Sequence, residues 1–228
     1  MIETTVVIPH SGSVETLIAV LTQLQTQTVL PKRIYLIDCS NDKSGLRIAK
    51  KFAFNNVPIV VEAVKGTIYE NWNRGLRFSQ NDYPRASILV INDDILLPVD
   101  AIERFQEAES YTSDLCYVPE TPPRNHSREY VAVPFKTRSS IQAIEPVKWM
   151  SGFVFYLSRQ CIDEVGLFDE GFKIWFGDTD YERRINKKGA IKIIRGLYVY
   201  HFGSCSHRYR TQEVQDQIAL DRALYYGG

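Results

Sequence analysis

The sequence predicts an α/β fold built on a mostly parallel sheet that helices cover on both faces. In the first hundred residues, short β-branched apolar runs alternate with polar or glycine-containing turns and then with helical patterns. Continuous apolar runs, as opposed to runs that alternate apolar and polar residues, are typical of strands buried on both faces. Ligands of such sheets bind beyond the carboxyl ends of the strands, so functional residues are expected at that edge.

The first half is expected to hold three strand–helix units and a fourth strand. The apolar runs predict strands at residues 5–8, 34–37, 58–61 and 87–91. Helices are predicted from apolar residues at helical spacing, which are Leu17, Leu21 and Leu24, then Ile48 and Phe52, then Ile68, Trp72, Leu76 and Phe78. Three polar residues, His10, Asp38 and Asp94, come at the carboxyl ends of three of these strands. The topology therefore gathers them at one edge of the sheet.

The second half begins with a proline-rich segment, residues 114–148, in which five prolines break any long helix. We expect loops there, with short strands such as 130–133. A loop of this length is either a binding loop or lid, or simply mobile, and the sequence leaves both readings open. Further on, the patterns predict a buried strand over 147–157, helices over 159–165 and 178–188, strands near 190–194 and 197–200, and a final helix over about 211–225.

Length and composition favour one domain, residues 1–228, because no internal repeat or linker interrupts the chain. The 27 basic residues balance 27 acidic ones, which disfavours a general binder of nucleic acid or of anionic membranes. No apolar stretch approaches the roughly 18 residues needed to cross a bilayer, and the first residues lack the pattern of a secretory signal. The cysteines Cys39, Cys116, Cys161 and Cys205 are isolated, which indicates reduced thiols and a cytoplasmic protein.

Asn92-Asp93-Asp94 ends a predicted buried strand. Two adjacent carboxylates repel each other unless a cation or a ligand offsets the repulsion. Carboxylate oxygens are natural ligands of Mg²⁺ and Mn²⁺, and a Mg²⁺ site typically combines one or two carboxylates with substrate phosphates. An Asx turn followed by a helix cap would use the same residues, so the motif alone leaves both readings open.

Two further patterns carry the same ambiguity. Asp178-Thr179-Asp180 starts a predicted helix, where a carboxylate serves as a cap, while a second one can face a cleft. His201 ends the last predicted strand, and a histidine there is either a hydrogen-bonded structural residue or a metal ligand. Cys205 and His207 lack a second ligand pair at the spacing of a zinc site, so zinc is rejected.

The order of these motifs resembles that of the inverting glycosyltransferases of family 2, from about residue 4 to residue 207. Val6-Val7-Ile8-Pro9 resembles the family's first strand and turn, and Asn73-Arg74-Gly75 resembles a signature that precedes the metal motif. Asn92-Asp93-Asp94 resembles the family's Asp-x-Asp, with Asn in place of the first Asp. This departure leaves Asp94 as the expected metal contact.

The acceptor side of the family is matched by residues 166–172 followed by 177–181. Gly177 stands where an acidic pair usually has Glu, and Asp178 retains the second acid. His201 falls where many members place a metal-binding histidine. The acceptor residues implied by the resemblance are Trp149, Gly152, Asp180 and Arg184.

The resemblance implies a GT-A fold, in which a Rossmann-like, mostly parallel sheet is joined by a smaller acceptor-side sheet. Residues 1–98 would bind the nucleotide-sugar, residues 99–210 the acceptor, and residues 211–228 would form a C-terminal helix. The donor would be a UDP-, GDP- or dTDP-sugar, and Asp94 and His201 would hold Mn²⁺ or Mg²⁺. Donor or cofactor contacts are expected from Pro9, His10, Asp38, Lys65, Asn73, Asn92 and Asp93.

In the mechanism that the resemblance implies, Asp178 takes the proton of an acceptor hydroxyl as it attacks the anomeric carbon. The sequence leaves the acceptor open, with a carbohydrate or glycolipid expected and nucleic acid disfavoured. Aromatic and basic residues near the C-terminus keep a peripheral membrane contact open; they are Arg208, Tyr209, Arg210, Tyr225 and Tyr226. Two alternatives stay open: a nucleotidyltransferase, although the turn after the first strand lacks the expected arginines, and a sugar-binding module without catalysis.

Overall fold

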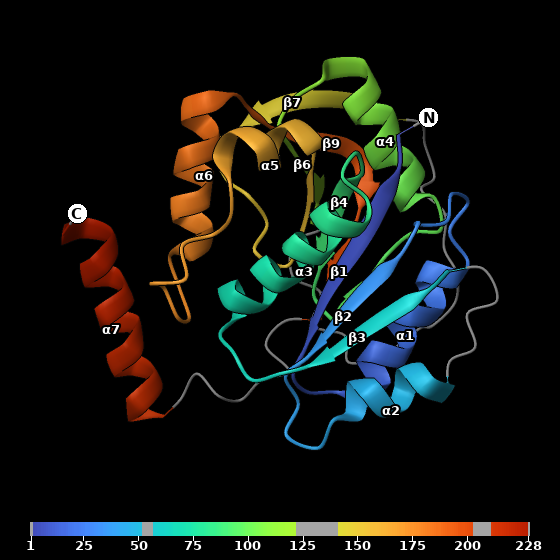
Figure 1. Cartoon of the computed structure of the whole chain (residues 1–228). Coiled ribbons are helices and arrows are strands. Elements are labelled where there is room, and N and C mark those ends of the chain that lie inside the picture. Colours follow the sequence, from blue (N-terminus) through green and yellow to red (C-terminus); the bar gives the residue numbers. More distant parts are fainter. Residues whose placement is uncertain (1, 52–56, 122–140, 203–210, 228) are drawn as a thin grey trace.

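The computed structural model describes residues 2–51, 57–121, 141–202 and 211–227, and its centre is a mixed eight-stranded sheet with helices on both faces (Figure 1). The strand order is β3-β2-β1-β4-β8-β6-β9-β7. The strands are β1 (Thr4–His10), β2 (Ile34–Asp38), β3 (Ile59–Ala63), β4 (Ser87–Ile91), β5 (Ile95–Leu96), β6 (Cys116–Glu120), β7 (Ala143–Val147), β8 (Val154–Leu157), β9 (Ile191–Tyr198) and β10 (Tyr200–His201). The helices are α1 (Val14–Gln25), α2 (Ser44–Lys51), α3 (Ile68–Asp82), α4 (Ala101–Thr112), α5 (Arg159–Val165), α6 (Gly177–Lys188) and α7 (Gln212–Gly227).

The first four main strands form the parallel half of the sheet, as predicted. β1 lies between β2 and β4 and is parallel to both, and β3 extends this half beyond β2. The register pairs His10 with Asp38, the last residues of β1 and β2. The carboxyl ends of these two strands therefore meet at one edge, which is where the sequence places polar residues.

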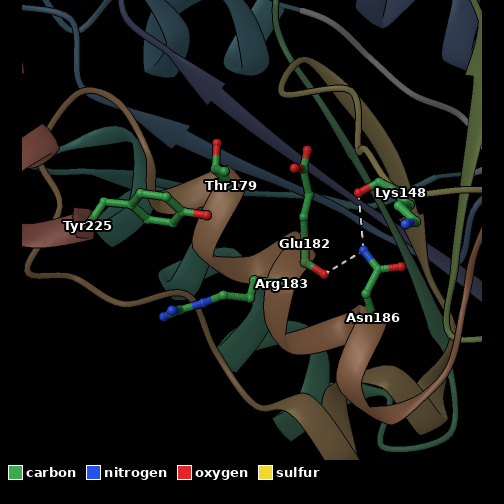
Figure 2. Close-up of a pocket in the computed structure, with 6 residues that line it drawn as sticks. All are labelled: Lys148, Thr179, Glu182, Arg183, Asn186 and Tyr225. Atoms are coloured by element: carbon green, nitrogen blue, oxygen red, sulfur yellow. Dashed lines mark hydrogen bonds between the residues drawn. The ribbon is translucent and has the colours of Figure 1, made fainter. Parts of the chain in front are cut away.

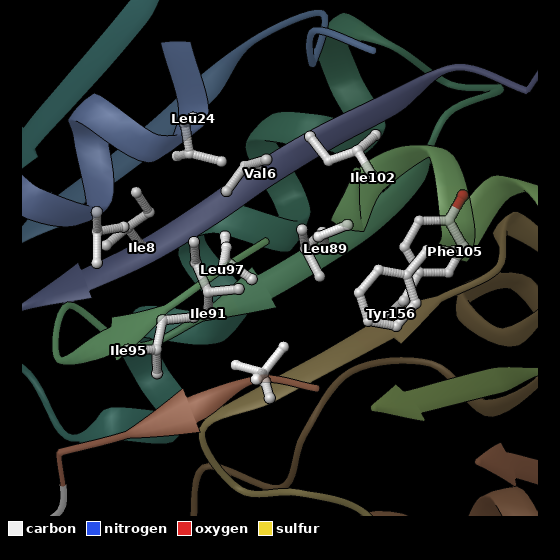
Figure 3. Close-up of a cluster of buried hydrophobic side chains, with 14 of the residues drawn as sticks. Val6, Ile8, Leu24, Leu89, Ile91, Ile95, Leu97, Ile102, Phe105 and Tyr156 are labelled. Atoms are coloured by element: carbon white, nitrogen blue, oxygen red, sulfur yellow. The ribbon is translucent and has the colours of Figure 1, made fainter. Parts of the chain in front are cut away.

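Alternate residues of the central strands build two cores, one on each face of the sheet. Val6 and Ile8 point into a cluster with helices α1 and α4, which Figure 3 shows around Leu24, Ile102 and Phe105. On the other face, Val7 packs against helices α3, α5 and α6 through a second cluster of buried residues, among them Tyr69, Trp72, Ile162 and Tyr181. Burial on both faces explains why these strands are continuous apolar runs.

The second half continues the same sheet, and here several predicted boundaries are wrong. The strand expected over 147–157 begins only at Val154, as β8. The backbone groups of 148–153 form hydrogen bonds with other partners. The two strands expected near 190–194 and 197–200 are mostly one strand, β9, which bends at Gly196 with a φ of 90°. Helix α4 was not predicted. The segment 122–140, with the strand expected at 130–133, and residues 203–210 lie outside the described residues.

A smaller two-stranded sheet, as the resemblance implies, lies apart from the main one. β10 pairs with β5 in an antiparallel register that sets His201 opposite Ile95. Because Ile95 follows Asp94 directly, this pairing brings the end of the chain's last strand to the end of β4. In the described part of the chain, no helix combines the length and apolar character needed to cross a bilayer.

Candidate functional site

The Asp94 carboxylate and the His201 imidazole meet at the carboxyl edge of the sheet. Nε2 of His201 lies 3.1 Å from Oδ1 of Asp94. The backbone holds both residues, since the N–H of Phe202 donates to the carbonyl oxygen of Asp94 at 3.0 Å. Asp94 is buried and His201 is partly exposed, so the pair faces the surface on the imidazole side. The structure thus brings together the two residues that were expected to hold a metal ion.

Phe153 fixes the orientation of this pair. Its ring stacks on the His201 imidazole, with the centroids 4.1 Å apart and an interplanar angle of 7°. Its carbonyl oxygen accepts a hydrogen bond from the backbone N–H of Asn92 at 2.9 Å. The side-chain oxygen of Asn92 is buried and has no hydrogen-bond partner within the described chain. An unpaired buried oxygen beside the pair is a site where a donor group or a cation would be stabilised.

The pair offers one carboxylate and one imidazole, which are donor types that divalent cations accept. Within the described residues, no group of three or more His, Cys, Asp or Glu side chains could hold a metal ion by itself. Mg²⁺ is commonly bound by one or two carboxylates together with substrate phosphates, and imidazole suits transition metals such as Mn²⁺ as a ligand. Asp94 and His201 therefore supply a donor set that a diphosphate would complete.

Asp93, the neighbour of Asp94, turns inward. Its Oδ2 lies 2.5 Å from Nδ1 of His10, whose Nε2 lies 3.0 Å from the hydroxyl of Ser44. His10 is fully buried, so this chain of contacts joins the ends of β1 and β4 to the start of α2. His10 and Asp93 hold the edge of the sheet in shape. Any contact with a donor would have to come from the partly exposed carboxylate of Asp93.

Two other residues that were expected to contact the donor instead form hydrogen bonds inside the fold. Asp38 is buried, and its carboxylate accepts hydrogen bonds from the N–H groups of Ser40 and Leu46, at 3.0 and 2.8 Å. Asn73 is fully buried on α3 and bonds to the N–H and the carbonyl oxygen of Phe168, both at 2.9 Å. Both side chains shape the loops around the edge. Pro9 is buried within β1, whereas Lys65 is exposed between β3 and α3.

Asp178 lies in the first turn of helix α6, with its carboxylate against Gly152. A Cβ atom added at Gly152 would come within 2.8 Å of Oδ2 of Asp178, so only glycine allows this approach. Burial raises the pKa of the Asp178 carboxyl, although hydrogen bonds from the backbone N–H groups at Thr179 and at Asp178 itself act in the opposite direction. A cavity of about 230 Å³ lies beside it, lined by Tyr69, Ile174, Trp175, Phe176, Asp178 and Thr179. A partly buried carboxylate with a raised pKa beside a cavity is suited to take up a proton.

Tyr69 explains the missing acid at position 177. A Cβ atom at Gly177 would lie 2.6 Å from ring atoms of Tyr69, so the phenol ring occupies the space that a side chain at 177 would need. The hydroxyl of Tyr69 donates to the carbonyl oxygen of Ile174 at 3.3 Å. Burial raises the pKa of Tyr69, and the charge of Asp178 adds to the effect, which shows that the two groups are close. No sequence signal pointed to Tyr69.

Glu182 is a residue of the site that the sequence analysis missed. It follows Asp178 by four positions and so lies on the same face of α6. Its carboxylate accepts a hydrogen bond from the backbone N–H of Met150 at 2.6 Å. Burial raises the pKa of Glu182 to about 7, opposed by this hydrogen bond and assisted by the charge of Asp178. The spacing of four after Asp178 was the signal that could have identified it.

The expected acceptor residues separate into two groups. Trp149 is 44% exposed and flanks Met150 and Gly152, so it is available to a ligand. Asp180 is buried, and its two oxygens accept hydrogen bonds from Arg183 and Arg184 at 2.9 and 2.8 Å. Arg184 also donates to the carbonyl oxygen of Val165 at 3.0 Å. Asp180 and Arg184 therefore tie α6 to its surroundings.

Two adjacent residues connect the proton-accepting side of the site with the metal-binding side. Gly152 lies against Asp178, and Phe153 stacks on His201. Since consecutive α-carbons are about 3.8 Å apart, the contact with Asp178 and the contact with His201 come from neighbouring positions of one segment. The three residues expected to act together are thus linked through one short segment.

No protein-family model matches this sequence, and no curated protein matches it either. Among solved structures the chain is similar to GalNAc-T7 crystallised with UDP, GalNAc and Mn²⁺, with a TM-score of 0.67 and 18% identity over 88% of this chain and 44% of that one. It is also similar to S. aureus TarS, with a TM-score of 0.66 and 17% identity over 97% of this chain and 40% of TarS. For TarS 1-349 in complex with UDP-GlcNAc, the TM-score is 0.66 and the identity 16%, over 96% of this chain and 65% of that one.

The chain spans less than two thirds of the length of each of these proteins. TM-scores of 0.66 and 0.67 establish the shared architecture, and identities of 16 to 18% leave the substrates to be argued from the site. The chain has the GT-A fold of glycosyltransferases, as its sequence predicts.

Proposed function

We propose that the chain is a metal-dependent, inverting glycosyltransferase that moves a sugar from a nucleotide-sugar to an acceptor hydroxyl. The observation that carries this proposal is the link between Asp178 and the Asp94–His201 pair through Gly152 and Phe153. In this proposal Asp178 is the base for the acceptor, Asp94 and His201 are ligands of a diphosphate-bound cation, and the segment 152–153 contacts both sides. Residues 1–98 would bind the donor and residues 99–210 the acceptor.

The roles of the residues follow from their surroundings. Asp178 accepts the proton of the acceptor hydroxyl while the oxygen attacks the anomeric carbon from the face opposite the leaving diphosphate. Its raised pKa makes it a stronger base than an exposed aspartate. Asp94 and His201 would hold Mn²⁺ or Mg²⁺, which when bound stabilises the charge that develops on the diphosphate. Exposed Lys65 adds positive charge near that edge.

The donor proposed is a UDP-sugar. The structures similar to this chain include one with UDP, GalNAc and Mn²⁺ and one with UDP-GlcNAc. The fold therefore accommodates uridine nucleotides in those proteins, and UDP-GlcNAc and UDP-GalNAc are the first donors to assay. The acceptor proposed is a carbohydrate, because the cavity beside Asp178 has polar groups together with the exposed indole of Trp175.

The test is the substitution Asp178→Asn, with Asp163→Asn on the exposed face of α5 as the matched control. Asp178→Asn should bind UDP as the wild type does and lose transfer, or slow donor hydrolysis without acceptor, by about 10²-fold or more. The control should keep both. Transfer within about tenfold of the wild type would contradict the role of Asp178.

A binding module without catalysis is the second candidate. It is favoured by the uncharged Asn92 and by Gly177, where the ring of Tyr69 leaves no space for an acidic side chain. Such a module would bind UDP-sugars and leave them intact. Prolonged incubation of the wild type with Mn²⁺ and each UDP-sugar separates the two, because only the enzyme releases UDP. The same measurement provides the reference rate for Asp178→Asn.

A further inference from the structure

A groove of about 440 Å³ runs along the outer side of helix α6, between this helix, helix α7 and the segment after β7 (Figure 2). It is lined by Lys148, Thr179, Glu182, Arg183, Asn186 and Tyr225. Its volume falls in the range of about 300–1,000 Å³ that is typical of small-molecule sites. The sequence analysis assigned none of this lining to acceptor binding, and it named Tyr225 only for a peripheral membrane contact.

The groove adjoins the cavity of Asp178 on helix α6. Thr179 lines both of them, with Asp178 on one side and Glu182 on the other. Residues 178, 182 and 186 lie one helical turn apart, so the groove leads away from the base along one face of α6. A ligand longer than one sugar would extend into it from Asp178.

The far wall of the groove is fixed in place. Helix α7 is anchored by Asp221, which is buried and accepts hydrogen bonds from the backbone N–H groups of Ile174 and Trp175 at 2.7 and 2.9 Å. Tyr225, one turn later, stacks on Phe176 with the ring centroids 5.4 Å apart. The segment that carries Trp175 and Phe176 leads directly into Asp178. Helix α7 thus positions both the far wall of the groove and the segment that leads into Asp178.

The chemistry of the lining favours a hydroxyl-rich ligand. Amine, guanidinium, amide, carboxyl and hydroxyl groups surround a single aromatic ring, so donors and acceptors of hydrogen bonds are mixed. The charged groups of the lining include both signs. The guanidinium of Arg183 donates to Asp180 at 2.9 Å, and Lys148 lines the same groove as Glu182. A lipid chain would require an apolar lining, and nucleic acid would require a surplus of cations.

We propose that this groove is a second acceptor subsite, which binds the neutral sugar unit next to the unit whose hydroxyl reaches Asp178. The acceptor is then an oligosaccharide of at least two units. The proposal rests on the function proposed above and adds the class of acceptor. Lys148, Asn186 and Tyr225 are the specificity residues, and they contact a part of the acceptor that does not react.

The experiment measures binding first, without donor, to an array of neutral oligosaccharides one to four units long. The variants are Lys148→Ala and Tyr225→Phe, which retains the stacking on Phe176. Their controls are Lys188→Ala at the end of α6 and Tyr111→Ala on α4, both exposed positions outside the groove. Transfer from UDP-GlcNAc and UDP-GalNAc to the oligosaccharides that bind is then measured with each protein.

We expect the wild type to bind a two-unit ligand at least about tenfold more tightly than its one-unit counterpart. Lys148→Ala and Tyr225→Phe should reduce this preference to less than about threefold, with donor hydrolysis unchanged, while the controls retain it. Binding that does not depend on length, no binding at all, or a preference that the variants retain would overturn the proposal. Absence of donor hydrolysis in the wild type would instead overturn the proposed function, because the binding measurement does not depend on turnover.

Discussion

The α-carbon of Gly152 faces the carboxylate of Asp178 so closely that a Cβ atom would lie 2.8 Å from Oδ2. Real Cβ atoms essentially never approach so closely, so the carboxylate would have to move. Gly152→Ala is therefore expected to displace Asp178 while leaving the fold intact. Misplacement of a reacting group by about 1 Å can cost about 10²-fold in rate.

The measurement for Gly152→Ala is kcat for transfer or donor hydrolysis, with UDP affinity as a second readout. Gly227→Ala is the matched control, because a Cβ atom there meets nothing within 4 Å. We expect kcat to fall by about 10²-fold and UDP affinity to be retained. A kcat equal to that of the control would show that Asp178 does not act from this position.

Asp94 and His201 should determine the effect of metal ions on nucleotide binding. UDP is expected to bind roughly tenfold or more tightly with Mn²⁺ than with EDTA, and Asp94→Ala or His201→Ala should remove that difference. Calorimetry of UDP binding measures it without turnover. Glu164→Ala, on the exposed side of α5, is the control. Equal binding of UDP by the wild type under both conditions would argue against a metal site.

Asp221 should contribute strongly to the anchoring of α7. Asp221→Ala leaves the partly buried N–H groups of Ile174 and Trp175 without their acceptor. The cost is roughly 1–3 kcal/mol for a fully buried group left unpaired, and less for these partly exposed ones. For a chain of this size, each kcal/mol lowers Tm by about 2–4 °C. Asp216→Ala, on the exposed side of the same helix, should change Tm little. Amide hydrogen exchange at 173–175 should accelerate in Asp221→Ala only, and similar Tm values for the two variants would refute this.

Glu182 should make stability depend on pH. Its pKa is about 7 in the folded chain and near 4.5 when unfolded, so the folded state binds more protons between these values and stability falls as pH rises through that window. Glu182→Gln should match the wild type in Tm at pH 4 and exceed it by a few degrees at pH 8. Lys148 and Arg183 line the groove together with Glu182, and the charge of Asp178 also acts on its carboxyl.

The control for this prediction is Glu164→Gln, at an exposed carboxylate on α5. Its Tm should follow that of the wild type at both pH values. If Glu182→Gln showed the same Tm difference from the wild type at pH 4 and at pH 8, the raised pKa of Glu182 would be wrong.

The apolar runs of the sequence are sufficient to predict the parallel half, because strands buried on both faces cannot carry polar residues. The bent strand β9 was less readable. A glycine such as Gly196 is typical of a turn between two strands. In the structure its positive φ instead bends one strand, which continues to Tyr198. The strand expected from 147 begins only at Val154, because Met150 gives its N–H to Glu182, a residue 32 positions away. Local patterns contain no information on such a partner.

Part of the candidate site was also predictable from the sequence. Asp94, Asp178 and His201 stand in recognisable motifs, so their residue types and order were enough to propose roles. The buried contacts of His10 and Asn73 are different, because they join residues 83 and 95 positions apart. Whether a polar side chain faces a ligand or supports the fold depends on these distant partners. Tyr69 was missed for the same reason, whereas the spacing of four residues after Asp178 could have identified Glu182.

The peptide unit between Gly152 and Phe153 has a consequence for engineering. Gly152 lies against Asp178, the proposed base, and Phe153 stacks on His201, the proposed metal ligand. Exchanging the segment 148–153 for that of another glycosyltransferase, in order to change acceptor preference, would therefore disturb leaving-group activation as well. Redesign of acceptor choice should therefore begin at Tyr225, which lines the groove from helix α7 and stacks on Phe176.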